Sequence, residues 1–162
     1  ASYAKIIKEL TTDLNVQIIL VPGRSIAGDA GVLASEIIYI KETDHKNFAI
    51  IDGAMNDLAR PGLYDSYHEI LPVEQKSGEV KTYDLAGPVC ETTDTLAKNR
   101  EINDARAGDL ILFLHAGAYG STMSNEYNSR PLVPEVLVDG DKFKVIRKRP
   151  TFEEMIKYET ND

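Results

Sequence analysis

The 162-residue sequence has a single cysteine, Cys90, and the carboxylate of Glu91 follows it directly. The pair comes just after a Gly87-Pro88 turn that ends an apolar run over 83–86. A lone cysteine most often packs inertly in a protein core. Because a neighbouring negative charge disfavours a thiolate, the pair does not suit a thiolate nucleophile. It is more consistent with a protonated thiol that donates a proton, for example to a carbanion.

A second group of polar side chains lies between 55 and 65, just after an expected strand over 47–52. Within this group Arg60 and Tyr64 are four residues apart, so a helical turn would place them on one face. A guanidinium and a phenol on one face suit a carboxylate ligand. The alternative is a loop in which Asn56 and Asp57 satisfy backbone groups.

Two further segments combine glycine with one larger side chain, and each follows an apolar run. In 22–25 (Pro-Gly-Arg-Ser) the guanidinium of Arg24 can fork onto a phosphate or a carboxylate. In 116–120 (Ala-Gly-Ala-Tyr-Gly) the small residues around Tyr119 would let a flat ligand approach the backbone. The alternatives are a strand-ending turn with a surface arginine and a glycine-rich turn with a packed tyrosine.

The N-terminal residues have the pattern of one unit of a parallel α/β fold. Apolar residues at helical spacing predict an amphipathic helix over 2–12. The apolar, β-branched run over 16–21 is typical of a strand buried on both faces. One such unit cannot close a parallel sheet, so we expect 2–22 to pack against another chain, to fray or to swap.

From Gly31 onwards the pattern changes to short strands, expected over 34–41, 47–52, 80–86, 108–115, 134–139 and 142–149. Asp139-Gly140 is a strong hairpin signal. A capping box of Thr151 and Glu154 predicts a last helix over 152–158. The predicted fold is mainly β: an antiparallel β-barrel or sandwich with a terminal helix over 31–162, preceded by one αβ unit over 1–30.

Composition excludes several classes of protein. The net charge of −8 disfavours nucleic-acid binding, because phosphate contacts need clustered Lys and Arg. No apolar run approaches the ~20 residues of a membrane span, and the first residues do not form a signal peptide. Three histidines (His45, His68 and His115) and one cysteine give no metal-ligand spacing, and the histidines are interpreted as structural or exposed. A single cysteine cannot form an internal disulfide, which fits a reducing compartment and favours the cytoplasm.

Taken jointly and in this order, the strings resemble the C-terminal part of diaminopimelate decarboxylases. These are pyridoxal-phosphate enzymes of the alanine racemase-like group, related to ornithine and arginine decarboxylases. The matching strings are Pro-Gly-Arg, Met-Asn-Asp-Leu-x-Arg-Pro, Gly-Pro-x-Cys-Glu, Ala-Gly-Ala-Tyr-Gly and Tyr-Asn-x-Arg-Pro, found here at 22–24, 55–61, 87–91, 116–120 and 127–131.

The resemblance implies a function in lysine biosynthesis, the conversion of meso-2,6-diaminopimelate to L-lysine and carbon dioxide. In that family an N-terminal barrel carries the lysine that holds pyridoxal 5'-phosphate, a C-terminal β-domain completes the site, and two subunits share each active site. Cys90 would be the catalytic proton donor, supplied to the neighbouring subunit of a homodimer. The other implied contacts are with the substrate, from Arg24, Arg60, Tyr64, Glu91 and Tyr119, and with the cofactor, from Gly23, Arg24 and Tyr119.

Two departures from the family pattern affect these expectations. Val21 stands where the family has a glutamate that pairs with the pyridine nitrogen, and no lysine here has the context of the cofactor lysine. We therefore expect a truncated N-terminus and a chain that is inactive by itself. The alternatives are a related decarboxylase for another amino acid with a distal carboxylate, and a non-catalytic interaction domain that keeps the dimer surface. The Cys90-Glu91 pair favours diaminopimelate, because the resembling sequences that act on ornithine or arginine have a Cys-Asp pair instead.

Overall fold

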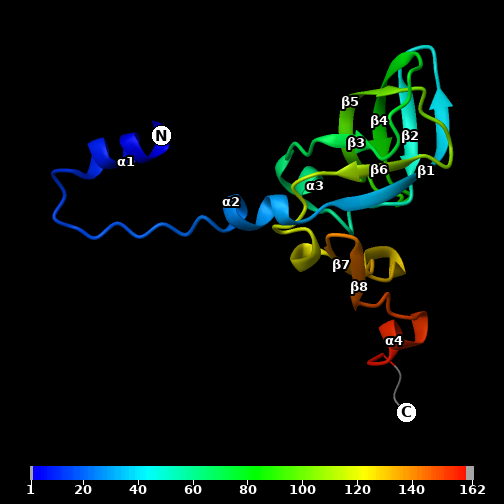
Figure 1. The fold of residues 1–162 in the computed structure, drawn as a ribbon. Helices are drawn as coiled ribbons and strands as arrows, with labels where there is room; N and C mark the ends of the chain where they lie inside the picture. Colours follow the sequence, from blue (N-terminus) through cyan, green and yellow to red (C-terminus); the bar gives the residue numbers. More distant parts are fainter. Residues whose placement is uncertain (1, 160–162) are drawn as a thin grey trace.

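The structure, a computed structural model, describes residues 2–159. Its body is a six-stranded sheet that curls into a nearly closed, barrel-like form, with strand order β3-β6-β1-β2-β4-β5 (Figure 1). Every pair of neighbouring strands is antiparallel except β2 and β4, which are parallel. The strands are β1 (Leu33–Glu42), β2 (Asn47–Ile51), β3 (Ile70–Pro72), β4 (Val80–Ala86), β5 (Thr95–Asn103) and β6 (Leu110–Phe113).

The inward faces of these strands form one hydrophobic core. On β6, Ile111 and Phe113 are fully buried, whereas Leu110 is exposed and Leu112 is only partly buried, which is the two-residue period of a sheet with one covered face. Ile37 of β1 and Leu85 of β4 are also fully buried. Each such side chain contributes ~1.5–3 kcal/mol by leaving water, so this core stabilises the loops that surround it.

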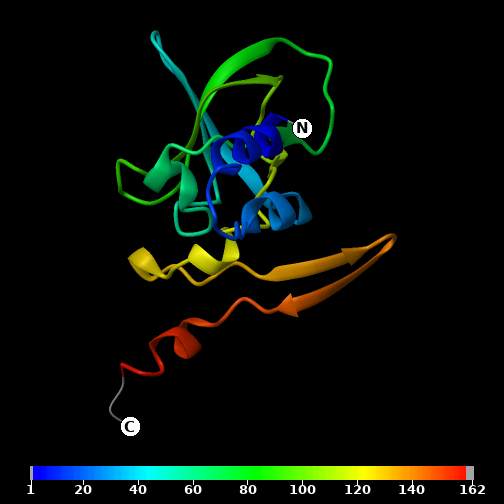
Figure 2. The ribbon, with the colours of Figure 1, turned by 90° about the vertical axis from the view of Figure 1, so that its left-hand side faces the viewer.

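Short helical turns and a hairpin surround one end of the barrel-like body. Figure 2 shows the hairpin of β7 and β8 lying beneath the body and leading to the last helix. The two-residue turn between its strands includes Gly140 at φ +60°, as the Asp-Gly signal predicted. These elements are α2 (Gly23–Ala27), η1 (Gly28–Ala30), α3 (Arg60–Tyr64), η2 (Ser121–Met123), η3 (Tyr127–Ser129), β7 (Glu135–Asp139), β8 (Lys142–Arg147) and α4 (Phe152–Ile156).

The sequence-based prediction of the elements is largely confirmed. The strands expected at 34–41, 47–52, 80–86 and 108–115 form as β1, β2, β4 and β6. The predicted capping box closes both ways: the Thr151 hydroxyl accepts from the Glu154 amide at 3.2 Å, and the Glu154 carboxylate accepts from the Thr151 amide at 2.8 Å. Strands β3 and β5 were not predicted.

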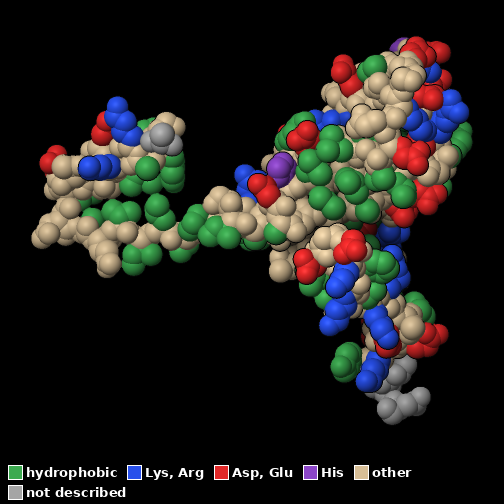
Figure 3. Space-filling view, viewed as in Figure 1, with side chains coloured by type: hydrophobic (Ala, Val, Ile, Leu, Met, Phe, Trp, Pro, Cys, Tyr) green, Lys and Arg blue, Asp and Glu red, His purple; other side chains and the backbone are tan. Residues whose placement is uncertain are grey.

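The N-terminal residues differ from the prediction in one respect. The expected helix forms as α1 (Ser2–Thr11), but 16–21 form no strand and extend away from the body (Figure 1). The expected burial on both faces is wrong for this chain, because Val16 is 62% exposed and Val21 is 89% exposed. A strand needs a neighbouring strand for its backbone hydrogen bonds, and none of residues 2–159 provides one here. Figure 3 shows the apolar side chains of this arm on the surface.

Candidate functional site

Arg60 lies near two tyrosine rings. Its guanidinium carbon is 5.8 Å from the ring centre of Tyr64 and 5.6 Å from that of Tyr119. Both distances fall within the range of cation–π attraction. The shared face of Arg60 and Tyr64 is thus as their spacing predicted, because α3 forms with Pro61 in its first turn and ends at Asp65, which has a left-handed backbone.

The turn at 22–25 joins this group from the other side. A Cβ atom on Gly23 would lie 3.7 Å from the hydroxyl oxygen of Tyr119, so that phenol approaches the glycine backbone. Arg24 is close enough to His68 for its charge to lower the pKa of the imidazole, as is Arg60. Gly23, Arg24, Arg60, Tyr64 and Tyr119 therefore gather in one cluster, which we call the arginine–tyrosine cluster.

Close backbone packing sets the position of Tyr119 in this cluster. The Ala116 amide donates to the Gly31 carbonyl at 2.9 Å, and the Gly117 amide donates to the Gly28 carbonyl at 3.0 Å. A Cβ atom on Gly117 would come within 2.2 Å of the Ala27 carbonyl oxygen, so only glycine fits there. Tyr119 itself has φ +62°, a left-handed backbone conformation that residues other than glycine rarely adopt. The 116–120 segment is held firmly against η1.

His68 is a buried residue at the base of the cluster. Its Nδ1 lies 2.8 Å from the Leu114 carbonyl oxygen, so this nitrogen carries the proton and donates it. Burial lowers the pKa of His68, and the charges of Arg60, His115 and Arg24 lower it further, against an opposing effect of the Leu114 bond. The imidazole is neutral at pH 7 and ties the end of β6 to the segment after α3, which agrees with its interpretation as structural.

Two buried polar residues just before α3 attach further segments to the body. The Asn56 amide nitrogen donates to the Tyr127 carbonyl at 2.7 Å and to the Asn125 carbonyl at 3.1 Å. The Asp57 carboxylate accepts from the Ala54 amide at 2.9 Å and lies 3.8 Å from the Arg130 guanidinium. Asn56 and Asp57 therefore satisfy backbone groups, as the loop alternative expects. Arg60 and Tyr64 lie in the cluster, and their binding of a carboxylate stays a prediction.

Cys90 and Glu91 lie apart from the arginine–tyrosine cluster, on the loop between β4 and β5. Both residues are exposed, and the thiol is free. Within residues 2–159, no hydrogen bond, ion pair or ring contact joins either side chain to the cluster. The predicted site residues thus form two separate groups on one chain.

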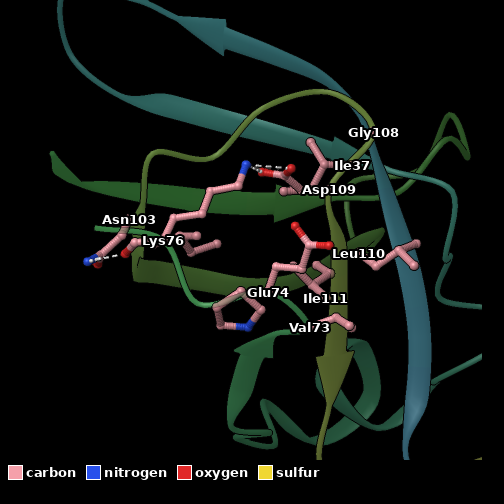
Figure 4. Close-up of a pocket in the computed structure, with 11 residues that line it drawn as sticks. Ile37, Val73, Glu74, Lys76, Asn103, Gly108, Asp109, Leu110 and Ile111 are labelled. Atoms are coloured by element: carbon pink, nitrogen blue, oxygen red, sulfur yellow. Dashed lines mark hydrogen bonds and ion pairs between the residues drawn. The ribbon is translucent and has the colours of Figure 1, made fainter. Parts of the chain in front are cut away.

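Two of the hollows on the surface of residues 2–159 lie beside strands of the body. The larger, of about 410 Å³, lies between α3 and the start of β5, and its lining includes the hydroxyl-bearing residues Ser66, Thr92, Thr93 and Thr95. The smaller, of about 150 Å³, is lined by core residues such as Ile37 and by the ion pair of Lys76 and Asp109 at 2.6 Å (Figure 4). None of the predicted site residues lines either hollow.

Two classes of site are not found in residues 2–159. No three His, Cys, Asp or Glu side chains come together there as ligands for a metal ion. None of the helices in that range has the length and apolar character needed to cross a membrane.

Comparisons with known proteins identify a family that matches most of this chain. Residues 11–117 match the family described as pyridoxal-dependent decarboxylase, C-terminal sheet domain. A diaminopimelate decarboxylase of Vibrio cholerae is 49% identical over 150 residues, which cover 92% of this chain and 36% of the relative. One from Zymomonas mobilis is 49% identical over 158 residues, which cover 98% of this chain and 37% of the relative. The chain thus spans little more than a third of the length of these curated relatives.

A solved structure gives the same result for the fold. The diaminopimelate decarboxylase of Helicobacter pylori complexed with L-lysine matches with a TM-score of 0.83 and 39% sequence identity, over 98% of this chain and 39% of that one. The chain therefore belongs to the family of C-terminal sheet domains of pyridoxal-dependent decarboxylases.

Proposed function

We propose that this chain forms the C-terminal sheet domain of a diaminopimelate decarboxylase, which converts meso-2,6-diaminopimelate to L-lysine and carbon dioxide. The observation that carries the proposal is the position of Arg60 near the rings of both Tyr64 and Tyr119, with Arg24 nearby. The names of the relatives and the L-lysine bound to the Helicobacter pylori structure point to the same substrate class.

The charges of the candidate site fit this substrate. Diaminopimelate differs from ornithine in that it carries a second carboxylate at its far end, beside its second ammonium group. The guanidinium of Arg60 would bind that carboxylate through paired N–H donors, and the carboxylate of Glu91 would bind the ammonium. A decarboxylase for ornithine or arginine would have no use for the arginine.

The cluster also fits one side of pyridoxal 5'-phosphate. The Tyr119 hydroxyl lies beside the Gly23 backbone, and Arg24 supplies a positive charge for a phosphate. The neighbouring Arg60, assigned above to the substrate, has a buried Nε with no hydrogen-bond partner among residues 2–159. When bound, this cofactor acts as an electron sink for the charge left when carbon dioxide departs. Gly23, Arg24 and Tyr119 would hold it, while its lysine would come from outside this chain.

The separation of Cys90 from the cluster supports a shared site in a homodimer. An exposed thiol that makes no hydrogen bond to the cluster within residues 2–159 is well placed to donate a proton in the site of a second subunit. A thiol with this role must stay reduced, which supports a cytoplasmic location. In this proposal 1–30 are the last elements of an N-terminal barrel and 31–162 are the sheet domain.

The test is carbon dioxide release from meso-diaminopimelate by the protein expressed from its complete reading frame, with pyridoxal 5'-phosphate added. Turnover together with cofactor absorbance above 400 nm would support the proposal. A protein of this mass with no cofactor band and no turnover would contradict it.

Val21 favours a second candidate, a non-catalytic homologue that serves as an interaction domain. Val21 replaces the family's glutamate at this position, and its side chain cannot pair with the pyridine nitrogen. Val21 is 89% exposed. The exposed apolar residues of 16–21 would then serve a protein partner. Val21→Glu separates the two candidates: it should raise turnover in a decarboxylase and change nothing in an interaction domain.

A further inference from the structure

The carboxylate of Asp94 links the two groups of predicted site residues. It is 3% exposed, and its two oxygens accept different backbone amides. Oδ1 accepts from Met55 and Oδ2 accepts from Val89, each at 2.6 Å. Met55 begins the segment that leads to Arg60, and Val89 directly precedes Cys90. One side chain therefore fixes the backbone of both segments.

The rest of the loop is built around this carboxylate. The Gly87 amide donates to the Asp94 carbonyl at 2.9 Å, and the Asp94 amide donates to the Glu91 carbonyl at 3.0 Å. A Cβ atom on Gly87 would come within 2.4 Å of the carboxylate, so glycine makes the room that Asp94 occupies. Next to Asp94, the Thr93 carbonyl oxygen lies 3.1 Å from the position that a Cβ on Gly62 of α3 would take.

The charge of Asp94 is not matched by a cation. Among the ion pairs of residues 2–159, none includes this carboxylate. A buried carboxylate is costly unless hydrogen bonds satisfy it, and amide donors to an ionised oxygen are about twice as strong as neutral hydrogen bonds. An uncharged side chain would avoid that cost. The presence of a carboxylate here indicates that the position needs a group that accepts on two oxygens at once.

We propose that Asp94 is a positioning residue that sets the place of Cys90 and Glu91 relative to α3 and Arg60. The inference rests on the proposed function for its catalytic consequence, although the linkage itself does not depend on it. The Cys90 and Glu91 side chains make no hydrogen bond or ion pair in residues 2–159, so their position depends on the backbone that the Asp94 bridge fixes.

Asp94→Asn is the direct test, because it keeps the shape while replacing one accepting oxygen with a donor. The matched control is Asp104→Asn, since Asp104 follows β5 as Asp94 precedes it and its partner is the exposed Arg106. If Asp94→Asn fails to fold, Gly87→Ala perturbs the same bridge from the opposite side.

The first readout uses this chain alone. Cys90 is its only cysteine, so a nitroxide label on the thiol reports the distance to the α3 amides by paramagnetic broadening. We expect Asp94→Asn to weaken that broadening and to speed hydrogen exchange at Met55 and Val89 at least 10-fold, while Asp104→Asn changes neither. Unchanged broadening and unchanged exchange in Asp94→Asn would overturn the proposal.

The second readout is kinetic and uses the protein from the complete reading frame. A displacement of about 1 Å in a group that must meet the substrate can cost ~10²-fold in rate. We expect Asp94→Asn to lower kcat ~10–100-fold, because the proton donor Cys90 is displaced, and to raise KM by a smaller factor, because Glu91 moves with it. An unchanged kcat would refute the positioning role. A wild-type protein without turnover would refute the proposed function instead, and the label experiment would still decide the linkage.

Discussion

Gly117→Ala tests whether the close backbone contact described above sets the position of Tyr119. The added Cβ would lie 2.2 Å from the Ala27 carbonyl oxygen, 2.7 Å from the Gly31 nitrogen and 3.0 Å from the Gly28 carbonyl oxygen. Even weakly attractive carbon–oxygen contacts lie at about 3.3–3.6 Å, so the two segments would have to separate by about 1 Å. All three obstructing atoms belong to the backbone, which cannot rotate away as a side chain can.

That separation would disturb both hydrogen bonds between 116–117 and the η1 turn. Overpacking costs ~1–3 kcal/mol and each of the two net hydrogen bonds ~0.5–1.5 kcal/mol, so we expect a loss of about 2–6 kcal/mol in the free energy of unfolding. Urea denaturation followed by circular dichroism is suitable, because the chain has no tryptophan.

Gly28→Ala is the matched control on the opposite side of the same contact. Its Cβ would lie 3.8 Å from the Arg24 side chain, an ordinary contact, so the free energy of unfolding should change by less than about 1 kcal/mol. Equal stability of Gly117→Ala and the wild type would refute the reasoning, since the clash would then be relieved without cost.

Three further predictions concern the cluster and the N-terminal arm. Arg60→Ala should raise the KM for meso-diaminopimelate about 10–100-fold in the complete protein, as expected for one charge-assisted contact, and an unchanged KM would count against a carboxylate at this position. Because burial lowers the pKa of His68, the unfolded chain binds a proton before the folded chain does, so the free energy of unfolding should fall as the pH drops below about 6.5. His68→Gln should flatten that slope between pH 7 and 5, whereas the exposed-residue control His45→Gln should not. Amides 16–21 should exchange at nearly the rate of an unstructured chain in dilute solution, and strong protection there would contradict their exposure.

Hydrophobic alternation predicted the strands whose inward residues are large and regular, but not the other two. Strand β3 has only three residues, and β5 alternates poorly. Asn99 within β5 has φ +53°, which breaks the two-residue period, and most of the neighbouring side chains are polar. At 16–21 the pattern predicted a strand that does not form. An apolar pattern indicates that a segment suits burial, but it does not indicate whether a partner strand is present.

The candidate site was predictable where spacing along one element decides the geometry. The contact of Arg60 with Tyr64 follows from the four-residue spacing, whereas the approach of Tyr119 depends on the packing of Gly117 against η1, which no local pattern reports. The bridge through Asp94 joins residues 39 positions apart, and an aspartate that folds a loop has no local signature that separates it from a surface aspartate.

The most direct test of the central claim is a mixing experiment with Cys90→Ala and Arg24→Ala in the protein from the complete reading frame. Each variant alone should be nearly inactive toward meso-diaminopimelate. If Cys90 serves the partner's site, a mixed dimer has one intact site, and random pairing of equal amounts should restore about a quarter of wild-type carbon dioxide release. No recovery on mixing, although mixed dimers form, would contradict the account, because Cys90 and Arg24 would then have to act within one chain.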